Sequence, residues 1–375
     1  MSDTTRAATP GAEATDLFLT LTPERVLAAV EAGGMRCTGA CYVLNSFENR
    51  VYEVELDDGP PGSRTRVVAK FYRPGRWSLD QLQEEHTFMH ELEAAEIPIC
   101  GLLEFPGGGT LRKVDHIHYC LYERKGGRAP DEVDASLAGR LGMLAARIHN
   151  VGATADAPHR KRLDADTFIR DPVDWLVEHG HPPAHARDRY MDAAFDLADI
   201  LEARVAAIDE LQLHRIHGDF HLGNLLLRDG LLLPLDFDDM TVAPAVQDLW
   251  LLLPGTDAFD LQLREHWITG YEQLRPFDRR QLSLIEPLRG ARIVHYAYWL
   301  ARRWHDPVFP RTWPHAMTDG WWEQETQDLV DLVAGLKGEA EADADADSAS
   351  ASADGAANPK EPELTNKDFF WDWDG

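Results

Sequence analysis

The stretch that decides the fold is RIHGDFHLGNLLLRDGLLLPLDFDD, residues 215–239. Two leucine triplets within it flank Arg-Asp-Gly at 228–230, a pattern that predicts a β-hairpin. Closing the hairpin brings the start of its first strand beside the end of its second. We therefore expect Asn224 and Asp236 to lie together at the open end of the hairpin, with Asp219 just before them on the loop.

Two carboxylates and an amide that converge in this way suit phosphoryl transfer from ATP. Amide and carboxylate oxygens are hard ligands for Mg²⁺, so we assign Asn224 and Asp236 to the metal. Asp219 then accepts a proton from the attacking hydroxyl or orients it. Protein kinases carry the same layout as H-R-D-x-x-x-x-N followed by D-F-G, and His217-Gly218-Asp219 and Leu235-Asp236-Phe237-Asp238 match it here. A lone H-G-D would be a chance turn, but the ordered set of three groups favours a site.

The upstream sequence predicts the part of the chain that holds the nucleotide. Residues 41–56 are expected to form two strands joined by the polar turn SFENR. Ser46 and Asn49 in that turn are candidates to accompany backbone N–H groups onto phosphate, and an ordinary hairpin turn is an equal alternative. Lys70 lies inside the apolar strand 67–72, where an unpaired charge is costly, and it matches the lysine of V-A-I-K that grips ATP phosphates.

The helix that follows supplies the expected partner of Lys70. It is predicted to begin at Ser78 and to continue to about Glu93, with apolar residues at helical spacing. Most acidic residues on such a helix face solvent, and only the nearby lysine singles any of them out. Glu85 is our choice for the ion pair with Lys70, and Glu84 is the rival.

The joint between the two parts of the molecule is expected after a strand at 116–123, in the polar segment 124–127. Backbone groups at the end of that strand would be available to adenine, so we include Glu123 in the ATP site. The remainder of the chain is expected to be mostly helical. Asp248 in an apolar helix is expected to accept backbone N–H bonds from the 217–219 loop, because a buried carboxylate needs partners.

Aromatic residues and arginines are concentrated between residues 289 and 322. The aromatic residues are interpreted as core. The arginines either receive an anionic substrate or pair with nearby acidic residues, and the second interpretation is slightly favoured. The aromatic residues are Tyr296, Tyr298, Trp299, Trp304, Trp321 and Trp322, and the arginines are Arg289, Arg292, Arg302 and Arg303.

Together these patterns predict an α+β, bilobal, protein-kinase-like fold with a small β-rich N-lobe and a larger helical C-lobe. We expect a disordered N-terminus at 1–15, the nucleotide-binding N-lobe at 16–123 and the helical C-lobe with the catalytic loop at 124–336. An acidic, low-complexity tail with an aromatic end is expected at 337–375.

The amino-acid composition of the chain limits the kinds of molecule it is expected to bind and the compartment in which it is expected to act. The chain has 375 residues, 44 % of them hydrophobic, and a net charge of −27, which disfavours nucleic acid and anionic membranes as partners. Four cysteines without a C-x-x-C pair are typical of a reducing compartment. Because we find neither a membrane-spanning apolar run nor an export signal, we expect a cytoplasmic protein. We also expect a monomer.

Several longer segments resemble one group of bacterial kinases beyond the general pattern. They are LNSFENRVYEVEL, VVAKFYRPGRW, LQEEHTF, RIHGDFHLGNLLLRDG, LDFDDMTVAPAVQDLW and LIEPLRGARIVHYAYWLARRWHDPVFP. Over about residues 17–336 the chain resembles the stress response kinase A family, of the RdoA/YihE type. HGDxHxGN marks only the wider superfamily, which includes small-molecule kinases, whereas NSFENRVY and FYRPGRW are more specific.

The resemblance implies a serine/threonine protein kinase with a fold like that of aminoglycoside phosphotransferases, acting on itself and other proteins under stress. By motif it implies Asp219 as proton acceptor, Asn224 and Asp236 as Mg²⁺ ligands, Ser46 as a nucleotide contact and Lys70 on ATP phosphate. The closest rival is a small-molecule phosphotransferase of the aminoglycoside, choline or homoserine type, which shares every catalytic residue. A nucleotide-binding regulator without turnover and a carboxylate-pair hydrolase are the more distant alternatives.

Overall fold

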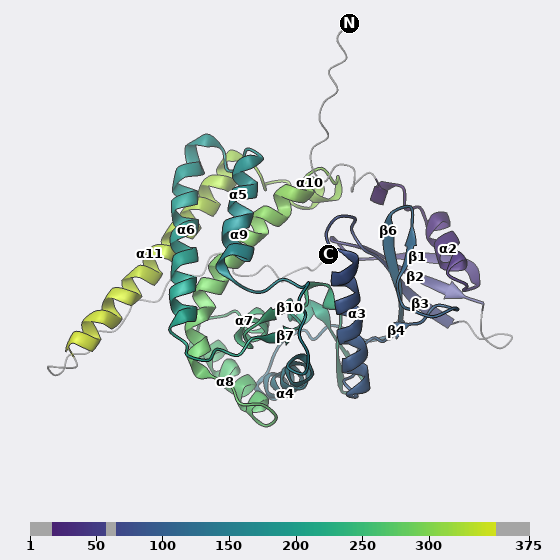
Figure 1. Ribbon diagram of the computed structural model, residues 1–375, viewed down its shortest axis with the longest axis horizontal. Helices are drawn as coiled ribbons and strands as arrows, with labels where there is room; N and C mark the ends of the chain where they lie inside the picture. The colour runs from purple at the N-terminus through teal and green to yellow at the C-terminus, as the bar shows by residue number, and fades with distance from the viewer. Residues whose placement is uncertain (1–16, 58–64, 350–375) are drawn as a thin grey trace, which may run out of the picture.

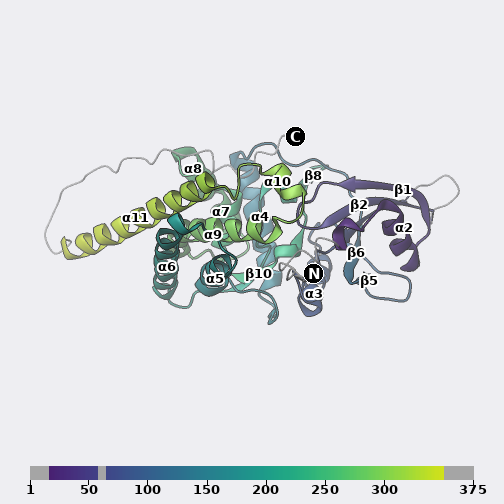
Figure 2. The same ribbon diagram turned by 90° about the horizontal axis from the view of Figure 1, so that it is seen from above.

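The computed structural model describes residues 17–57 and 65–349, and side chains as far as residue 339. A sheet-rich N-terminal part lies beside a larger helical part, and helix α3 lies between them (Figures 1 and 2). The molecule therefore has the α+β bilobal architecture that the sequence predicts. The disorder predicted for residues 1–15 and the aromatic end predicted for the tail lie outside the described residues.

The N-terminal part is one antiparallel sheet with two helices. Its strands follow the order β1-β2-β3-β6-β4, and β5 pairs with β6. Helix α2 begins where the Thr22 side chain accepts a hydrogen bond from the Arg25 N–H, with Pro23 in its first turn. The elements are α2 (Pro23–Ala32), β1 (Cys37–Leu44), β2 (Arg50–Leu56), β3 (Thr65–Phe71), α3 (Leu79–Ala94), β4 (Leu102–Leu103), β5 (Arg112–Val114) and β6 (Ile117–Glu123).

Helix α3 links the two parts because its apolar side chains join the larger core. Ser78 and Gln81 form a reciprocal capping box at its start, which holds the first turn in register. Leu82, Phe88 and Met89 are buried in the core that continues into the helical part. A second core, built from α2 and the sheet, includes Phe71 and Tyr119. The packing of α3 in the larger core therefore fixes the position of its acidic residue Glu85 relative to Lys70 of β3.

The helical part begins with α4 (Ala135–Gly152), which packs along α8 (Ala258–Glu272). Two glycines permit this close contact: a Cβ atom at Gly142 would lie 2.0 Å from the Trp267 carbonyl oxygen, and one at Gly270 would lie 1.9 Å from that of Gly139. The other elements are α5 (Asp171–Glu178), α6 (Ala184–Ala206), β7 (His214–Ile216), β8 (Leu225–Arg228), β9 (Leu231–Pro234), β10 (Thr241–Ala243), α7 (Val246–Leu252), α9 (Ile285–Arg303), α10 (Val308–Thr312) and α11 (Asp319–Ala349).

The start of the acidic tail differs from expectation. Instead of a low-complexity linker from residue 339, helix α11 continues to Ala349 and projects beyond α6 and α9, against which it packs (Figure 1). Alanine is the strongest helix former and occupies every second position from Ala340 to Ala346, so the helix extends past its packed region.

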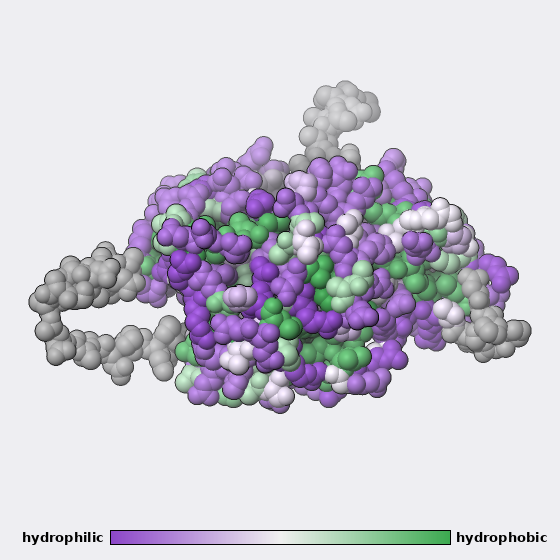
Figure 3. Space-filling model, turned by 60° about the horizontal axis from the view of Figure 1, so that its bottom comes forward, coloured by the Kyte–Doolittle hydropathy of each residue, from purple (hydrophilic) through white to green (hydrophobic). Residues whose placement is uncertain are grey.

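On the face that Figure 3 shows, the apolar side chains form separate patches. Figure 3 shows hydrophilic side chains over most of the visible side, with hydrophobic side chains gathered in patches between them. Among the described residues, no helix has both the length and the apolar composition needed to cross a bilayer.

Candidate active site

The predicted hairpin is confirmed and forms one wall of a cleft. Strands β8 and β9 pair antiparallel from Leu225 opposite Pro234 to Arg228 opposite Leu231. The two turn residues, Asp229 and Gly230, both have positive φ (50° and 80°), the conformation of the tight turns that suit the twist of paired strands. At the open end the Leu235 N–H donates to the Asn224 carbonyl oxygen at 2.8 Å. Asn224 and Asp236 are thereby held at the same end.

Asp219 lies beside Asn224 and is held by three side chains. The Asn224 amide nitrogen donates to the Asp219 carbonyl oxygen at 3.0 Å and to its Oδ2 at 3.2 Å. Arg292 Nη2 lies 3.1 Å from Oδ1, and His221 Nε2 lies 3.4 Å from Oδ2. Burial alone would raise the pKa of Asp219, but His221 and Arg292 outweigh it and hold that pKa well below its ordinary range. The carboxylate is therefore ionised.

Asp248 supports the catalytic loop from behind, as predicted. Its carboxylate accepts the backbone N–H groups of His217 (3.0 Å) and Gly218 (2.9 Å), and it contacts His149 Nε2 at 3.0 Å. Burial raises the pKa of Asp248 to about 6, against the lowering effect of His217 and the two N–H bonds. A Cβ atom at Gly218, where φ is +84°, would lie 2.1 Å from the Asp239 carbonyl oxygen, so glycine is required there.

Lys70 on β3 is surrounded by carboxylates. Its Nζ lies 2.6 Å from Asp236 Oδ1, 3.6 Å from Asp238 Oδ1 and 3.8 Å from Glu85 Oε1. Burial alone would lower the pKa of Lys70, but Asp236 and Asp238 outweigh it and raise that pKa well above its ordinary value. The lysine is therefore charged, and Asp236 is its nearest partner.

The expected choice between Glu85 and Glu84 is decided by the orientation of α3. Glu85 is fully buried and faces Lys70, and burial raises the pKa of Glu85 to about 7. Glu84 instead accepts the backbone N–H groups of His159 and Arg160, at 3.1 and 2.9 Å. It therefore fastens the 159–160 segment to α3 and does not reach the lysine.

The 45–49 turn is hydrogen-bonded to helix α9 of the helical part. Glu48 accepts hydrogen bonds from Trp299 Nε1 (2.7 Å) and Arg303 Nη2 (2.8 Å) of α9. Burial would raise the pKa of Glu48, but Arg303 and the neighbouring Arg76 hold it well below its ordinary value. Ser46 Oγ accepts the Asn49 N–H at 3.3 Å, which stabilises the turn.

Asn49 occupies a different place from the nucleotide contact expected of it. Its side chain is buried, with Nδ2 donating to Asp238 Oδ2 at 3.0 Å and Oδ1 accepting the Arg73 N–H at 3.2 Å. Both polar atoms are thus used within the protein, and Asn49 does not line the cleft. It joins the turn to the acidic segment after Asp236.

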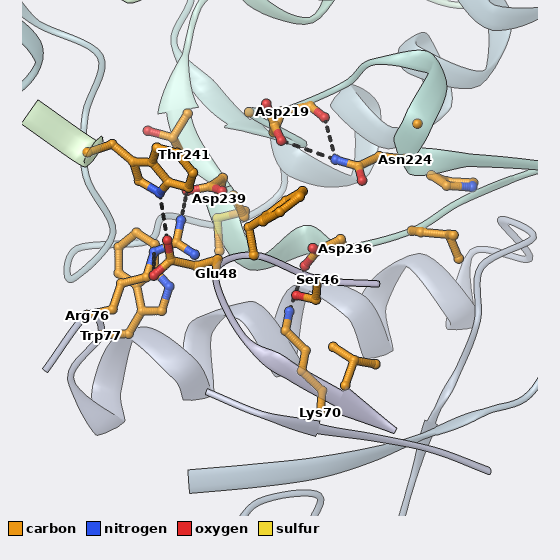
Figure 4. Close-up of a pocket in the computed structure, with 18 of the residues that line it drawn as sticks. Ser46, Glu48, Lys70, Arg76, Trp77, Asp219, Asn224, Asp236, Asp239 and Thr241 are labelled. Carbon is orange, nitrogen blue, oxygen red and sulfur yellow. Dashed lines mark hydrogen bonds and ion pairs between the residues drawn. The ribbon is translucent and has the colours of Figure 1, made fainter. Parts of the chain in front are cut away.

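The cleft has a volume of about 910 Å³, and most of the expected site residues line it. Those are Ser46, Lys70, Glu123, Asp219, Asn224 and Asp236. In Figure 4 Lys70 points at Asp236, and Asp219 faces Asn224 across the same space. Glu85 lies behind Lys70 and supports it.

Glu123 lies where the adenine contact was expected, but its backbone N–H is already bonded. That N–H donates to the Gly101 carbonyl oxygen at 2.9 Å, and the carboxylate pairs with Lys125 at 3.0 Å. An adenine contact there would therefore use another backbone group of this segment.

Asn224 and Asp236 fit a hard divalent cation. Asn224 uses its amide nitrogen on Asp219, which leaves Oδ1 as its remaining polar atom. Asp236 has a left-handed backbone (φ 57°), and 45 % of its side chain is exposed to the cleft. One amide oxygen and one carboxylate are the donor types that Mg²⁺ prefers, with phosphate and water oxygens completing its shell.

At the other end of the cleft the aromatic residues of α9 differ from their expected core role, whereas the arginines were expected either to receive an anionic substrate or to pair with acidic residues. Of the aromatic residues interpreted as core, Tyr296, Tyr298 and Trp299 line the cleft, and Trp322 is the one that is fully buried. Of the arginines, Arg292, Arg302 and Arg303 line it as well. The available signal for this face was the helical spacing of the residues of α9. The polar and aromatic residues that line the cleft recur every three to four positions, on a different face from the fully buried residues.

Further cleft residues come from segments that carried no motif. Figure 4 shows several of them around Glu48 at one side of the cleft, opposite Lys70. They include Arg76, Trp77, Lys161, Asp239 and Thr241. The FYRPGRW segment, which contains Arg76 and Trp77, was recognised by resemblance and not by any chemical pattern.

Comparison with known sequences gives consistent matches. The model of the phosphotransferase enzyme family matches residues 42–285. The chain is 34 % identical over 316 residues to stress response kinase A of Escherichia coli (strain K12), covering 84 % of this chain and 93 % of that protein. It is 36 % identical over 318 residues to the serine/threonine protein kinase RdoA of Salmonella typhimurium, with the same coverage of 84 % and 93 %.

Solved structures share the fold at lower identity. An amicoumacin kinase in complex with AMP-PNP and Ca²⁺ superposes with a TM-score of 0.67 at 18 % identity, over 84 % of this chain and 95 % of that one. A spectinomycin phosphotransferase in complex with ADP and spectinomycin gives a TM-score of 0.60 at 12 % identity, over 85 % and 99 % of the two chains.

Proposed function

The chain belongs to the phosphotransferase enzyme family, among the relatives of stress response kinase A, and on this premise we propose that it is an ATP- and Mg²⁺-dependent serine/threonine protein kinase. It is a kinase that transfers phosphate to an alcohol acceptor. The observation that carries the proposal is the approach of Asp219, Asn224, Asp236 and Lys70 to one cleft.

Each group has a role that its surroundings support. Asp219 orients the acceptor hydroxyl and takes its proton late in the transfer, because its low pKa makes it a weak base. Lys70, held charged by its carboxylates, positions the phosphates of ATP. Mg²⁺ held by Asn224 and Asp236 would offset the charge of the triphosphate. Ser46 and the backbone near Glu123 are the proposed contacts to the rest of the nucleotide.

The names of the relatives support the choice of a protein acceptor. RdoA is called a serine/threonine protein kinase, and the match spans 93 % of that protein, so both lobes are included. We extend the proposal to autophosphorylation, to a role in stress response and to action as a monomer in the cytoplasm, where ATP is available.

The test is transfer of labelled phosphate from Mg-ATP, followed by mass spectrometry of the protein itself. We expect phosphorylated Ser or Thr on the chain and on added protein substrates, and none with the Asp219→Asn variant. A panel of choline, homoserine and an aminoglycoside runs in parallel. Transfer to a panel compound with no transfer to protein would instead make this a small-molecule kinase.

A further inference from the structure

The end of the cleft away from Lys70 contains the side-chain amine of Lys161. Lys161 lines the cleft, and its backbone carbonyl oxygen accepts Thr241 Oγ1 at 2.7 Å and the Val242 N–H at 3.0 Å. Its Nζ lies 5.9 Å from the ring centres of both Trp77 and Phe168. The backbone of Lys161 is therefore anchored at β10, and its side chain reaches the cleft beside two aromatic rings.

Lys161 and Arg302 differ from every other cation discussed at this cleft. Within the ranges 17–57 and 65–339, neither has a carboxylate within ion-pair distance, although the whole chain carries a charge of −27. The Arg302 guanidinium donates to the Tyr298 hydroxyl at 2.8 Å and lies over the rings of Tyr298 and Trp175. By contrast, Arg76 and Arg303 are paired with acidic residues.

The groups that face Lys161 make its positive charge costly without an anion. Burial lowers the pKa of Lys161, Asp239 opposes this shift, and the nearby arginines Arg76, Arg302 and Arg303 add to it, so that the resulting pKa is about 8. Asp239 is itself paired with Arg76, Glu48 is paired with Arg303, and Asp171 is a further carboxylate of the cleft lining.

A histidine at the same end has an unused polar atom. His295 lies between Phe168 and Tyr298, with ring centres 5.2 and 5.6 Å away. Its Nδ1 is buried and has no hydrogen-bond partner among the residues whose side chains the structure describes, and burial and the surrounding cations hold the pKa of His295 well below its ordinary value. Within the described part of the chain, this end of the cleft thus combines two cations that have no carboxylate at ion-pair distance with a neutral imidazole and aromatic rings.

We propose that this end of the cleft, built around Lys161 and Arg302, binds acidic side chains of the acceptor and gives the enzyme a preference for Ser or Thr flanked by Asp or Glu. The proposal rests on the proposed protein kinase function. A cationic acceptor would meet like charge here, whereas a carboxylate would pair with both residues in a partly desolvated site. In the reaction, the acceptor oxygen forms its bond to the γ-phosphorus as the bond to the ADP oxygen breaks, and the hydroxyl proton passes to Asp219.

The chain contains a natural probe for this preference. Residues 341–354 read EADADADSASASAD, three serines among acidic residues. A peptide of this sequence is compared with a neutral twin in which each Asp is replaced by Asn and Glu by Gln, so that length and serine positions are unchanged.

The first measurement is kcat/KM for phosphate transfer from Mg-ATP to the two peptides by the full-length protein. We expect the acidic peptide to be preferred about tenfold or more, a ratio that corresponds to roughly 1.4 kcal/mol. Lys161→Gln and Arg302→Gln should each remove most of this preference. Lys113→Gln, which removes an exposed cation of β5 outside the cleft, should keep it. Equal rates for the two peptides with the unaltered protein would overturn the inference and leave the kinase assignment intact.

A binding measurement separates this inference from the proposed function. Both peptides are made with alanine in place of serine, and their affinities are measured by calorimetry with and without Mg-AMP-PNP. Tighter binding of the acidic peptide that is lost in Lys161→Gln and Arg302→Gln supports the anion site even if no peptide is phosphorylated, in which case the protein kinase proposal fails alone. Equal affinities for the acidic and neutral peptides would contradict the anion site whether or not transfer occurs.

Discussion

The two ends of the cleft differ in how their cationic side chains are paired with carboxylates. At the end where we place the nucleotide, Lys70 lies within 4 Å of three carboxylates, Asp236, Asp238 and Glu85. At the other end, Lys161 and Arg302 have aromatic neighbours and no carboxylate at that distance within the described side chains. The first arrangement suits ATP, the co-substrate that we propose, because ATP is the same in every turnover. The second leaves charge available for a partner that varies, which is where specificity is expected to arise.

The two ends also differ in how they are supported. The catalytic loop is fastened from behind by Asp248 and His149, and His217 Nε2 donates to the Leu235 carbonyl oxygen at 2.8 Å, which ties the loop to the hairpin. The opposite end depends on the hydrogen bonds that the Lys161 carbonyl oxygen accepts from β10 and on ring packing along α9. Substitutions at the first end should therefore affect every acceptor, and those at the second end should affect one class of acceptor.

The largest expected effect is at the nucleotide end. Asp236→Asn and Asp219→Asn should each lower kcat by roughly 10³-fold or more for every acceptor, because transfer depends on placed charges rather than on covalent chemistry. The measurement is initial rate with saturating Mg-ATP, with circular dichroism to verify that the fold is retained.

Asp229→Asn is the matched control, because it makes the same change on the hairpin turn, where the Asp229 side chain is 87 % exposed. Its rate should equal that of the unaltered protein. Retention of full activity in Asp219→Asn would remove the catalytic assignment of that residue.

An intermediate effect is expected behind the catalytic loop. Asp248→Asn replaces one acceptor oxygen with an amide donor that faces a backbone N–H, so we expect about 3 kcal/mol lower stability towards unfolding. The loop should also lose its position, with kcat reduced roughly tenfold to a hundredfold while KM for ATP changes little. Urea unfolding and steady-state kinetics test the two parts. Normal kcat in a destabilised variant would limit Asp248 to a purely structural role.

The smallest expected effect is a pH dependence at the acceptor end. Lys161 is charged below its pKa of about 8 and neutral above it, so preference for the acidic peptide should be present at pH 7 and fall several-fold as pH rises through 8 to 9.5. The measurement is the ratio of kcat/KM for the acidic and neutral peptides, whose Asp and Asn residues do not titrate in this range.

Lys161→Arg provides the control for this pH effect, because arginine stays charged throughout the range. Its preference should persist to pH 9.5. A ratio that falls identically in Lys161→Arg and in the unaltered protein would assign the pH effect to another group.

Features that depend on neighbouring residues were predictable from the sequence. The hairpin with its Asp-Gly turn, the start of α3 at Ser78, the strand that carries Lys70 and the bilobal α+β class are all present in the structure. The contacts of Asp248 with the catalytic loop were also predicted, because a carboxylate in an apolar helix close in sequence has few other partners. Assignment of Glu85 over Glu84 needed only the final rotation of α3.

Other features were decided by segments that meet only in the folded molecule. Asn49 is turned away from the cleft because Asp238, 189 residues later, accepts its amide. Residues of α9 line the cleft because α9 packs where the 45–49 turn and the 161–168 segment can reach it. Local sequence patterns report period, capping and turn geometry, which act over a few residues. The sequence by itself therefore determined the elements and the motif that closes on Asp219, whereas only tertiary packing decided which cations of the described residues have no carboxylate partner and so are available to the acceptor that we propose.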